Sequence, residues 1–355
     1  MSTDASHDPH PGSATRRDGE LWLDRFARCL GFGWLAARLP GDPKPSYVYA
    51  VTTVVVATGS LVGYNVVAGV PLIYEENPYF ALLPLLLLGS VYGSHALSRQ
   101  YDRAMDDMRI AERASDPTPL LNAYPSWLPW VLFGVGATVQ LIRSARHFGL
   151  LVVPVGVVKN VVVYPFVYTP ILAQFAAVYL AIEFFAPLRL YRSDVGINFL
   201  DPEGVGGLRP LGELIKRAYY YIVAGLVAGA FITYAPLVES AWQVFPFMNA
   251  VFTSIWIVSI GTVGFAVLTL HRFMYREKRA EKSRLEAELL NHIENPWDMK
   301  EYEIPEDKQA EVEDLRQRMD RISATREYPA TFSIWTQLLL SIVLPKAVQL
   351  FLSAA

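Results

Sequence analysis

The chain has 355 residues, of which 52% are hydrophobic and 18% are charged, and its mean hydropathy is +0.25. This composition is too apolar for an ordinary soluble domain and predicts an all-α, polytopic membrane protein with a modest aqueous part. The net charge of −3 provides no basic surface for nucleic acid, and the single cysteine, Cys29, excludes an intrachain disulfide and a cysteine metal cluster.

The N-terminal region is predicted to precede the membrane. Residues 1–19 are polar and lack the apolar core of a cleavable signal peptide, so we expect a disordered cytoplasmic tail. Residues 20–46 are expected to form an amphipathic juxtamembrane helix over Glu20–Leu39, followed by a proline-rich linker. Such a helix can lie in the membrane interface or pack on the protein's own cytoplasmic part, and the sequence leaves both open.

Residues 47–271 are predicted to form a transmembrane bundle of six spans, because each apolar run approaches or reaches the length needed to cross the hydrocarbon core. The expected spans are Tyr47–Ile73, Tyr79–Leu97, Trp127–Ile142, Phe166–Leu188, Leu214–Pro236 and Phe245–Leu270. The second is expected to continue as a charged helix to Arg113. Residues 126–189 contain three apolar runs, and which of them cross is left open. We favour Val152–Val163, which includes Lys159, as a segment on the outer side.

Orientation follows from the distribution of lysine and arginine. These residues collect before the first span, after the second, in the loop over residues 191–212 and after the sixth span. The N-terminus and these segments are therefore expected in the cytoplasm and the C-terminus outside, in a multi-pass protein of the plasma membrane.

A cytoplasmic helical hairpin is expected over residues 272–330. Its first helix, Arg272–Glu294, prolongs the sixth span and carries charges at pairing distance along the helix. Its second helix, Glu306–Arg326, has a thin apolar stripe made by Val312, Leu315, Met319 and Ile322. The remaining residues, 331–355, are predicted to contain the seventh and last transmembrane helix, Thr331–Leu352.

The last span is less uniformly apolar than the others. Candidate pore-lining residues are Ser333, Gln337, Ser341, Lys346 and Gln349. Steps of four residues place most of them on one helix face, which predicts a water-facing helix. The alternatives are hydrogen bonding between helices and, for Lys346, an ammonium group that reaches the outer interface.

A glycine-rich loop over residues 201–212 precedes the fifth span. Gly204, Gly206 and Gly207 allow a backbone that exposes amide groups, which predicts an anion-binding nest at the start of that span. The alternative is a tight turn that ends in Pro210 at the helix start. The glycine spacing does not match a dinucleotide-binding motif.

Enzyme signatures are absent from the sequence. It has no phosphate-binding loop, no Gly-x-Ser-x-Gly and no His-Glu-x-x-His, and its six histidines are scattered. We therefore expect no catalytic residues, no metal and no cofactor. Glu183, late in the fourth span, is expected to lie close to Arg189 at the membrane–water interface.

Two features carry a resemblance to known proteins. The glycine-rich loop and the Tyr328–Pro329 entry to a proline-bearing last span look like an uncharacterised family of bacterial and archaeal polytopic membrane proteins, over residues 189–355. In topology the chain is similar to the seven-transmembrane ion-channel superfamily that includes insect odorant and gustatory receptors. That resemblance implies a pore lined by the last helix and a cytoplasmic anchor formed by extensions of the spans.

We therefore expect an oligomeric, channel-like, chemoreceptor-like protein in the lipid bilayer, assembled from copies of this chain without nucleic acid. A small-molecule ligand is left open. The alternatives are a membrane sensor or scaffold that signals through its cytoplasmic helices and, third, a membrane-embedded enzyme in which His95, Glu183 and His271 would converge.

Overall fold

The computed structural model describes residues 20–69, 72–76, 78–146, 157–234, 246–292, 304 and 308–327, together with residues 343, 344, 346, 347, 350 and 351. Every regular element in these residues is a helix. The predicted N-terminal tail and the candidate pore residues Ser333, Gln337, Ser341 and Gln349 lie outside the described residues.

Six helical segments among the described residues are long and apolar enough to cross a membrane. They are α3 (Pro45–Ala68), η1 with α5 (Pro78–Ala81, Leu82–Asp107), α8 (Leu128–Arg146), a composite helix of η3, α10, η4 and α11 (Val158–Tyr168, Thr169–Leu180, Ala181–Phe185, Ala186–Arg192), α12 (Arg209–Tyr234) and most of α13 (Pro246–Leu290). This architecture is compatible with a multi-pass membrane protein. The predicted seventh span falls almost entirely outside the described residues.

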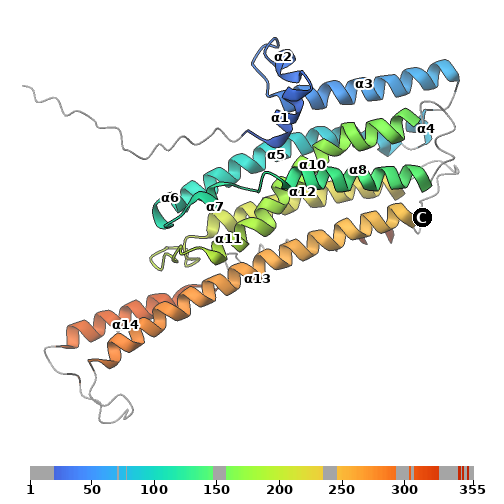
Figure 1. Ribbon diagram of the computed structural model, residues 1–355. Coiled ribbons are helices and arrows are strands. Elements are labelled where there is room, and N and C mark those ends of the chain that lie inside the picture. Colours follow the sequence, from blue (N-terminus) through green and yellow to red (C-terminus); the bar gives the residue numbers. More distant parts are fainter. Residues whose placement is uncertain are drawn as a thin grey trace, which may run out of the picture.

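The long helices run along a shared direction, and α13 extends beyond the others at one end (Figure 1). There the short helix α14 (Gln309–Ala324) packs on α13 through buried Leu285, Leu315 and Ile322. The ammonium group of Lys278 on α13 donates to the carbonyl of Thr325, 2.8 Å away, just beyond the end of α14. A cation at this position stabilises a helix C-terminus because the last carbonyl groups lack partners within the helix.

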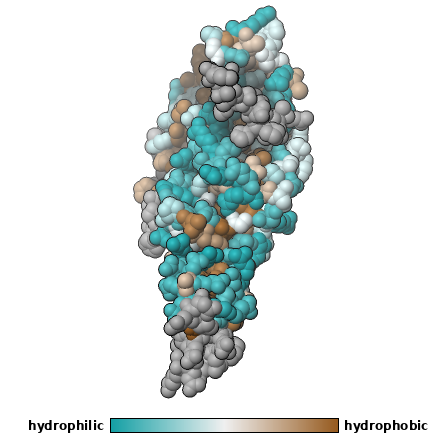
Figure 2. Space-filling view, turned by 90° about the vertical axis from the view of Figure 1, so that its left-hand side faces the viewer, coloured by the Kyte–Doolittle hydropathy of each residue, from teal (hydrophilic) through white to brown (hydrophobic). Residues whose placement is uncertain are grey.

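We call the end of the bundle near α6 (Ile110–Arg113), α7 (Thr118–Leu121) and α11 the charged end. Hydrophilic side chains cover most of the surface that can be seen there, as expected for a face in water (Figure 2). Arg189 donates to the carbonyl groups of Pro119 (2.8 Å) and Ala123 (3.1 Å) and so fastens the connection that follows α7. Hydrogen bonds from Ser115 lower the pKa of the exposed Asp194 carboxyl.

Away from the charged end, many of the outward-facing side chains are apolar. On α3, Val55 and Val67 are 63% and 90% exposed, and on α13 Ile257 and Val258 are both 57% exposed. Contiguous apolar surfaces of this kind are unusual on soluble monomers. They suit helices that face lipid.

The fourth span begins earlier than predicted. The sequence prediction assigned Val152–Val163 to the outer side, but Val158–Val163 belong to the wide π-helical turns of η3, so the helical segment starts at Val158. Pro165 lies inside η3, although it lacks an N–H donor for the helix. Two side-chain hydroxyl groups donate hydrogen bonds to carbonyl groups near the proline: Ser144 Oγ donates to Asn160 O (2.8 Å), and Thr169 Oγ1 donates to Tyr164 O (2.8 Å). Such replacement allows proline within a membrane-spanning helix.

Two further helix boundaries differ from the prediction. Residues 20–39 form two short helices, α1 (Trp22–Cys29) and α2 (Phe32–Ala36), because Gly31 takes a left-handed conformation with φ +91° and ends α1. The charged continuation of α5 likewise stops at Asp107, and Arg109 has φ +51° before α6 begins.

The first helix packs on the bundle rather than standing apart from it. Trp22, Leu23 and Ala27 are buried against α3 and neighbouring helices. Neither α1 nor α3 has a side-chain cap from its own N-cap residue. Gln174 Oε1 accepts from the amide of Leu23 (3.0 Å), and Asp24 Oδ1 accepts from the amide of Ser46 (3.2 Å). Long-range partners thus satisfy amides that local caps normally satisfy.

Candidate functional site

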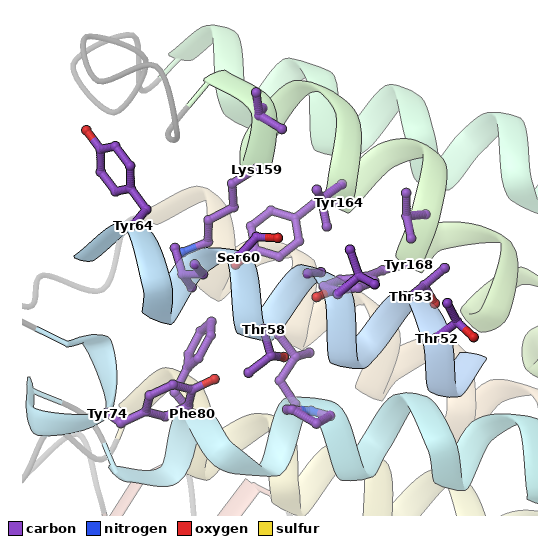
Figure 3. A pocket seen from close by; sticks show the side chains of 18 of the residues that line it. Thr52, Thr53, Thr58, Ser60, Tyr64, Tyr74, Phe80, Lys159, Tyr164 and Tyr168 are labelled. Atoms are coloured by element: carbon purple, nitrogen blue, oxygen red, sulfur yellow. The ribbon is translucent and has the colours of Figure 1, made fainter. Parts of the chain in front are cut away.

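A cavity of about 700 Å³ lies between α3, η3 and the start of α5. Its volume is in the range of pockets that bind small molecules. The walls are mostly aliphatic and aromatic, with hydroxyl groups from Thr52, Thr58, Ser60, Tyr64, Tyr74 and Tyr168 among the lining side chains (Figure 3). Val56 and Val158 line the cavity and are also exposed, so the cavity opens toward the outside of the bundle.

One wall of the cavity is fixed by a hydrogen bond between helices. Tyr49 on α3 donates its hydroxyl to the carbonyl of Val167 on η3, at 2.8 Å. The nearby Thr53 hydroxyl donates back to the carbonyl of Tyr49, at 2.7 Å, and is therefore already used within α3. The remaining hydroxyl groups are spread along the walls, so the cavity can orient a polar group without being polar throughout.

Lys159 supplies the cationic group of this cavity. Its side chain extends from η3 beside Tyr164 (Figure 3), and Nζ lies 5.3 Å from the ring centre of Phe80 and 5.6 Å from that of Tyr164. These distances are typical of cation–π contacts. The sequence prediction placed Lys159 outside the hydrocarbon core. The structure makes Lys159 the second residue of the membrane-length helical segment Val158–Arg192, at the end opposite Arg192.

A second cation lies close by. Arg143 on α8 donates from Nη2 to Asn160 Oδ1 (3.0 Å), and its guanidinium carbon is 4.7 Å from the Tyr164 ring centre. Within the described parts of the chain, neither Arg143 nor Lys159 forms an ion pair with a carboxylate. Arg143 is not among the described residues that line the cavity, so Lys159 is the cation that faces a ligand there. An apolar cavity lined by a cation is chemically suited to an amphipathic molecule that carries an anionic group.

Of the candidate pore residues, the structure describes Lys346. It is partly buried, and its Nζ lies 5.8 Å from the ring centre of Trp256 on α13. The last segment therefore approaches α13 at this residue. The polar face predicted from Ser333, Gln337, Ser341 and Gln349 stays a prediction from the sequence.

Backbone amides of the glycine-rich loop bind a carboxylate from the loop itself, that of Asp201. Gly204, Gly206 and Gly207 have φ values of +67°, +68° and +74°. Asp201 Oδ2 accepts from the amides of Val205 (3.1 Å) and Gly207 (2.8 Å). An external anion at these amides would have to displace the Asp201 carboxylate. The loop also contacts the residues after α14, because the carbonyl of Gly204 accepts from the amide of Arg326 at 2.8 Å.

A serine, a histidine and an aspartate meet where α1, α3 and α5 join, an arrangement that the sequence did not indicate. Asp24, Ser46 and His95 are 2%, 0% and 3% exposed. Ser46 Oγ lies 2.8 Å from His95 Nε2, and Asp24 Oδ2 lies 3.7 Å from the same nitrogen. The ammonium group of Lys44 lies 3.4 Å from Nδ1.

This cluster lacks the geometry of a catalytic triad. A lysine ammonium can only donate, so Nδ1 is the acceptor and Nε2–H donates to Ser46. In a hydrolytic triad the histidine instead accepts the serine proton, and the aspartate binds the other ring nitrogen. The cluster fastens α1 to the bundle. Among the residues described, His95 contacts Ser46, His271 contacts the carbonyl of Glu327, and the Glu183 carboxyl oxygens have no hydrogen-bond partner, so these three side chains do not form one site. No group of three potential metal ligands occurs among the described residues.

Comparison of the chain with protein-family models, with curated proteins and with solved structures finds no match. The function is therefore inferred from the site itself.

Proposed function

We propose that this protein binds an amphipathic small molecule with an anionic group, such as a long-chain carboxylate, in the cavity between α3, η3 and α5. The observation that carries the proposal is Lys159, a cation in an apolar cavity without a carboxylate partner among the described residues. Cations within membrane-spanning helices are costly and commonly mark the path or site of a substrate.

The cavity suits each part of such a molecule. Its apolar walls would bury an alkyl chain, which favours binding by about 0.8 kcal/mol for each methylene group removed from water. An anionic head beside Lys159 would form a charge-assisted hydrogen bond with its ammonium group that a neutral head cannot form as strongly, and the nearby Arg143 guanidinium would add electrostatic attraction. The cavity also opens beside exposed apolar side chains, so a ligand dissolved in the membrane could reach it directly.

The cavity lies toward the end of the bundle opposite the charged end. Lys159 is near the start of the fourth span, whereas Arg189 and Arg192 are at its other end. In the orientation predicted from the sequence, Lys159 is therefore on the outer side and α14 is on the cytoplasmic side. This arrangement favours the sensor alternative, in which the cavity receives a ligand and the helices at the charged end pass on the signal.

The proposal is tested with a photoactivatable long-chain fatty acid and with the corresponding fatty alcohol, using the full-length chain in nanodiscs. We expect crosslinks on α3 and η3, competed by unlabelled acid at least about tenfold better than by alcohol, equivalent to 1.4 kcal/mol. Lys159→Met should remove this preference, and Lys159→Arg should keep most of it. Lys346→Met is the matched control and should leave it unchanged.

Two results would contradict the proposal. One is equal competition by acid and alcohol in the wild type. The other is a preference for the acid that persists in the Lys159→Met variant, since the cation would then play no part in recognition.

The channel-like alternative is supported by the polar face that the sequence predicts for residues 331–352 and by the approach of Lys346 to α13. Its test is electrical recording from the chain reconstituted in liposomes, combined with the symmetry of the particle in electron microscopy. A monomeric particle without conductance would contradict it.

A further inference from the structure

Glu183 is a fully buried carboxyl within a membrane-length helix. It lies in η4, a π-helical turn between α10 and α11, and its side chain is 0% exposed. Neither carboxyl oxygen has a hydrogen-bond partner among the described residues. An unpaired carboxyl in such a place is costly, and both intramembrane acids and π-helical turns occur frequently at functional sites.

The surroundings of Glu183 contain hydroxyl groups but no cationic partner in the described structure. The titratable groups that interact with it are Tyr179, one turn earlier on α10, and Tyr219 on α12. Tyr179 also contacts α13, which packs against η4 as well. The Tyr179 hydroxyl lies 3.0 Å from Thr262 Oγ1 of α13 and donates at 3.4 Å to Ser259 O of the same helix. Phe184 stacks on Phe265 with ring centres 4.6 Å apart, which closes that side with apolar surface.

The cations on the helices that pack against η4 are engaged elsewhere or exposed. Arg189 on α11 donates to carbonyl groups of the connection after α7, and Arg217 on α12 pairs with Glu213. On α13, His271 contacts the carbonyl of Glu327. Lys216 is partly exposed, and Arg192 and Arg272 are exposed at the charged end. None of them forms an ion pair with Glu183, so the negative charge of an ionised carboxylate would have no compensation.

We propose that Glu183 is a proton-binding site that exchanges its proton with water at the charged end. In the described conformation the carboxyl holds the proton and is neutral. Release converts the acid and a water molecule into the carboxylate and a hydronium ion, with no other reactant. The carboxylate then requires donors, and the hydroxyl groups of Tyr179 and Tyr219, which interact electrostatically with Glu183, would supply them.

The location of Glu183 provides a short route for exchange. Arg189 follows six residues later, which corresponds to about 9 Å along a helix. Glu183 itself lies in the wide turn of η4, which continues to Phe185 in the direction of that end. Because a π-helical turn contains an extra residue, its shift or loss rotates neighbouring side chains onto other faces of the helix. Such a rearrangement would bring the carboxyl from apolar surroundings to water.

The test is infrared spectroscopy of the full-length chain in nanodiscs. We expect the wild type at neutral pH to show the C=O stretch of a neutral carboxyl that is missing from Glu183→Gln. The band should shift in D₂O and disappear at alkaline pH, and replacing Na⁺ by choline should not change it. Glu213→Gln, which removes an exposed carboxylate, is the matched control and should retain the band. Lys159→Met should retain it too, because this site is independent of the proposed ligand cavity.

A second measurement needs no variant. A carbodiimide adds to a neutral carboxyl and rearranges to a stable N-acylurea, so mass spectrometry of the wild type should find the adduct at Glu183 at neutral pH and lose it as the pH rises. Three results would overturn the proposal: no neutral-carboxyl band at neutral pH, a band that never shifts in D₂O, or a band and adduct that Na⁺ abolishes. The last would indicate a sodium site.

Discussion

Replacing Gly206 by alanine should destabilise the charged end more than the same replacement at Gly204. Both glycines are left-handed, with φ +68° and +67°. A methyl group at Gly206 would lie 2.4 Å from Ile197 Cγ2, whereas at Gly204 the nearest atom, the carbonyl oxygen of Ala324, would be 3.9 Å away. Gly204→Ala therefore carries the backbone strain alone, and Gly206→Ala adds a steric clash.

The two contributions have different magnitudes. A left-handed conformation costs an L-residue about 1–2 kcal/mol, and forcing an extra methyl group into a packed site costs about 1–3 kcal/mol. We expect Gly204→Ala to lower the free energy of unfolding by about 1–2 kcal/mol and Gly206→Ala by about 2–5 kcal/mol. Each kcal/mol lost lowers the melting temperature by roughly 2–4 °C in chains of about 150–250 residues, and by less in a longer chain. The difference in melting temperature between the two variants should therefore be measurable.

The assay is thermal unfolding of the purified chain in nanodiscs at one fixed heating rate, since unfolding of a membrane protein is commonly irreversible. The variant Ile197→Ala removes the methyl group that would clash. Combined with Gly206→Ala, it should recover part of the loss, so that the double variant loses less than the sum of the single variants. Equal losses for the two glycine variants, or strictly additive losses in the double variant, would refute the reasoning.

Two further predictions concern the attachment of α1 and α14. Gln174→Leu removes the acceptor of the Leu23 amide and the donor to the Tyr124 hydroxyl, so it should cost about 1–3 kcal/mol and speed proteolysis around residues 30–45. Gln140→Leu is the control, because the buried Oε1 of Gln140 has no partner among the described residues, and equal proteolysis of both variants would contradict the assignment. Leu315→Ala should cost about 2–5 kcal/mol but release α14 alone, so that limited proteolysis over residues 308–327 accelerates. The control Gln317→Ala, at an exposed position on the same helix, should behave like the wild type, and a loss of the whole fold in Leu315→Ala would contradict the prediction.

The sequence by itself determined the helical class and the approximate positions of the six described membrane-length helices. Apolar runs such as Leu214–Pro236 exceed the length of an ordinary buried helix, and that property is local to the run. The apolar stripe of α14 was also predicted from the sequence, because Val312, Leu315 and Ile322 recur at helical spacing. All three side chains are buried in the structure.

The tertiary structure alone decided how the helices end and where the candidate sites lie. Pro165 lacks an N–H donor and would ordinarily interrupt a helix, but the hydroxyl groups of Ser144 and Thr169 supply hydrogen bonds that let the helix continue and bring Lys159 to the cavity. The amide of Leu23 is satisfied by Gln174, 151 residues away. Hydrophobic periodicity records only which face of a segment is apolar. The partners of backbone groups, and the burial of a carboxyl such as Glu183, depend on distant segments that meet only when the bundle is assembled.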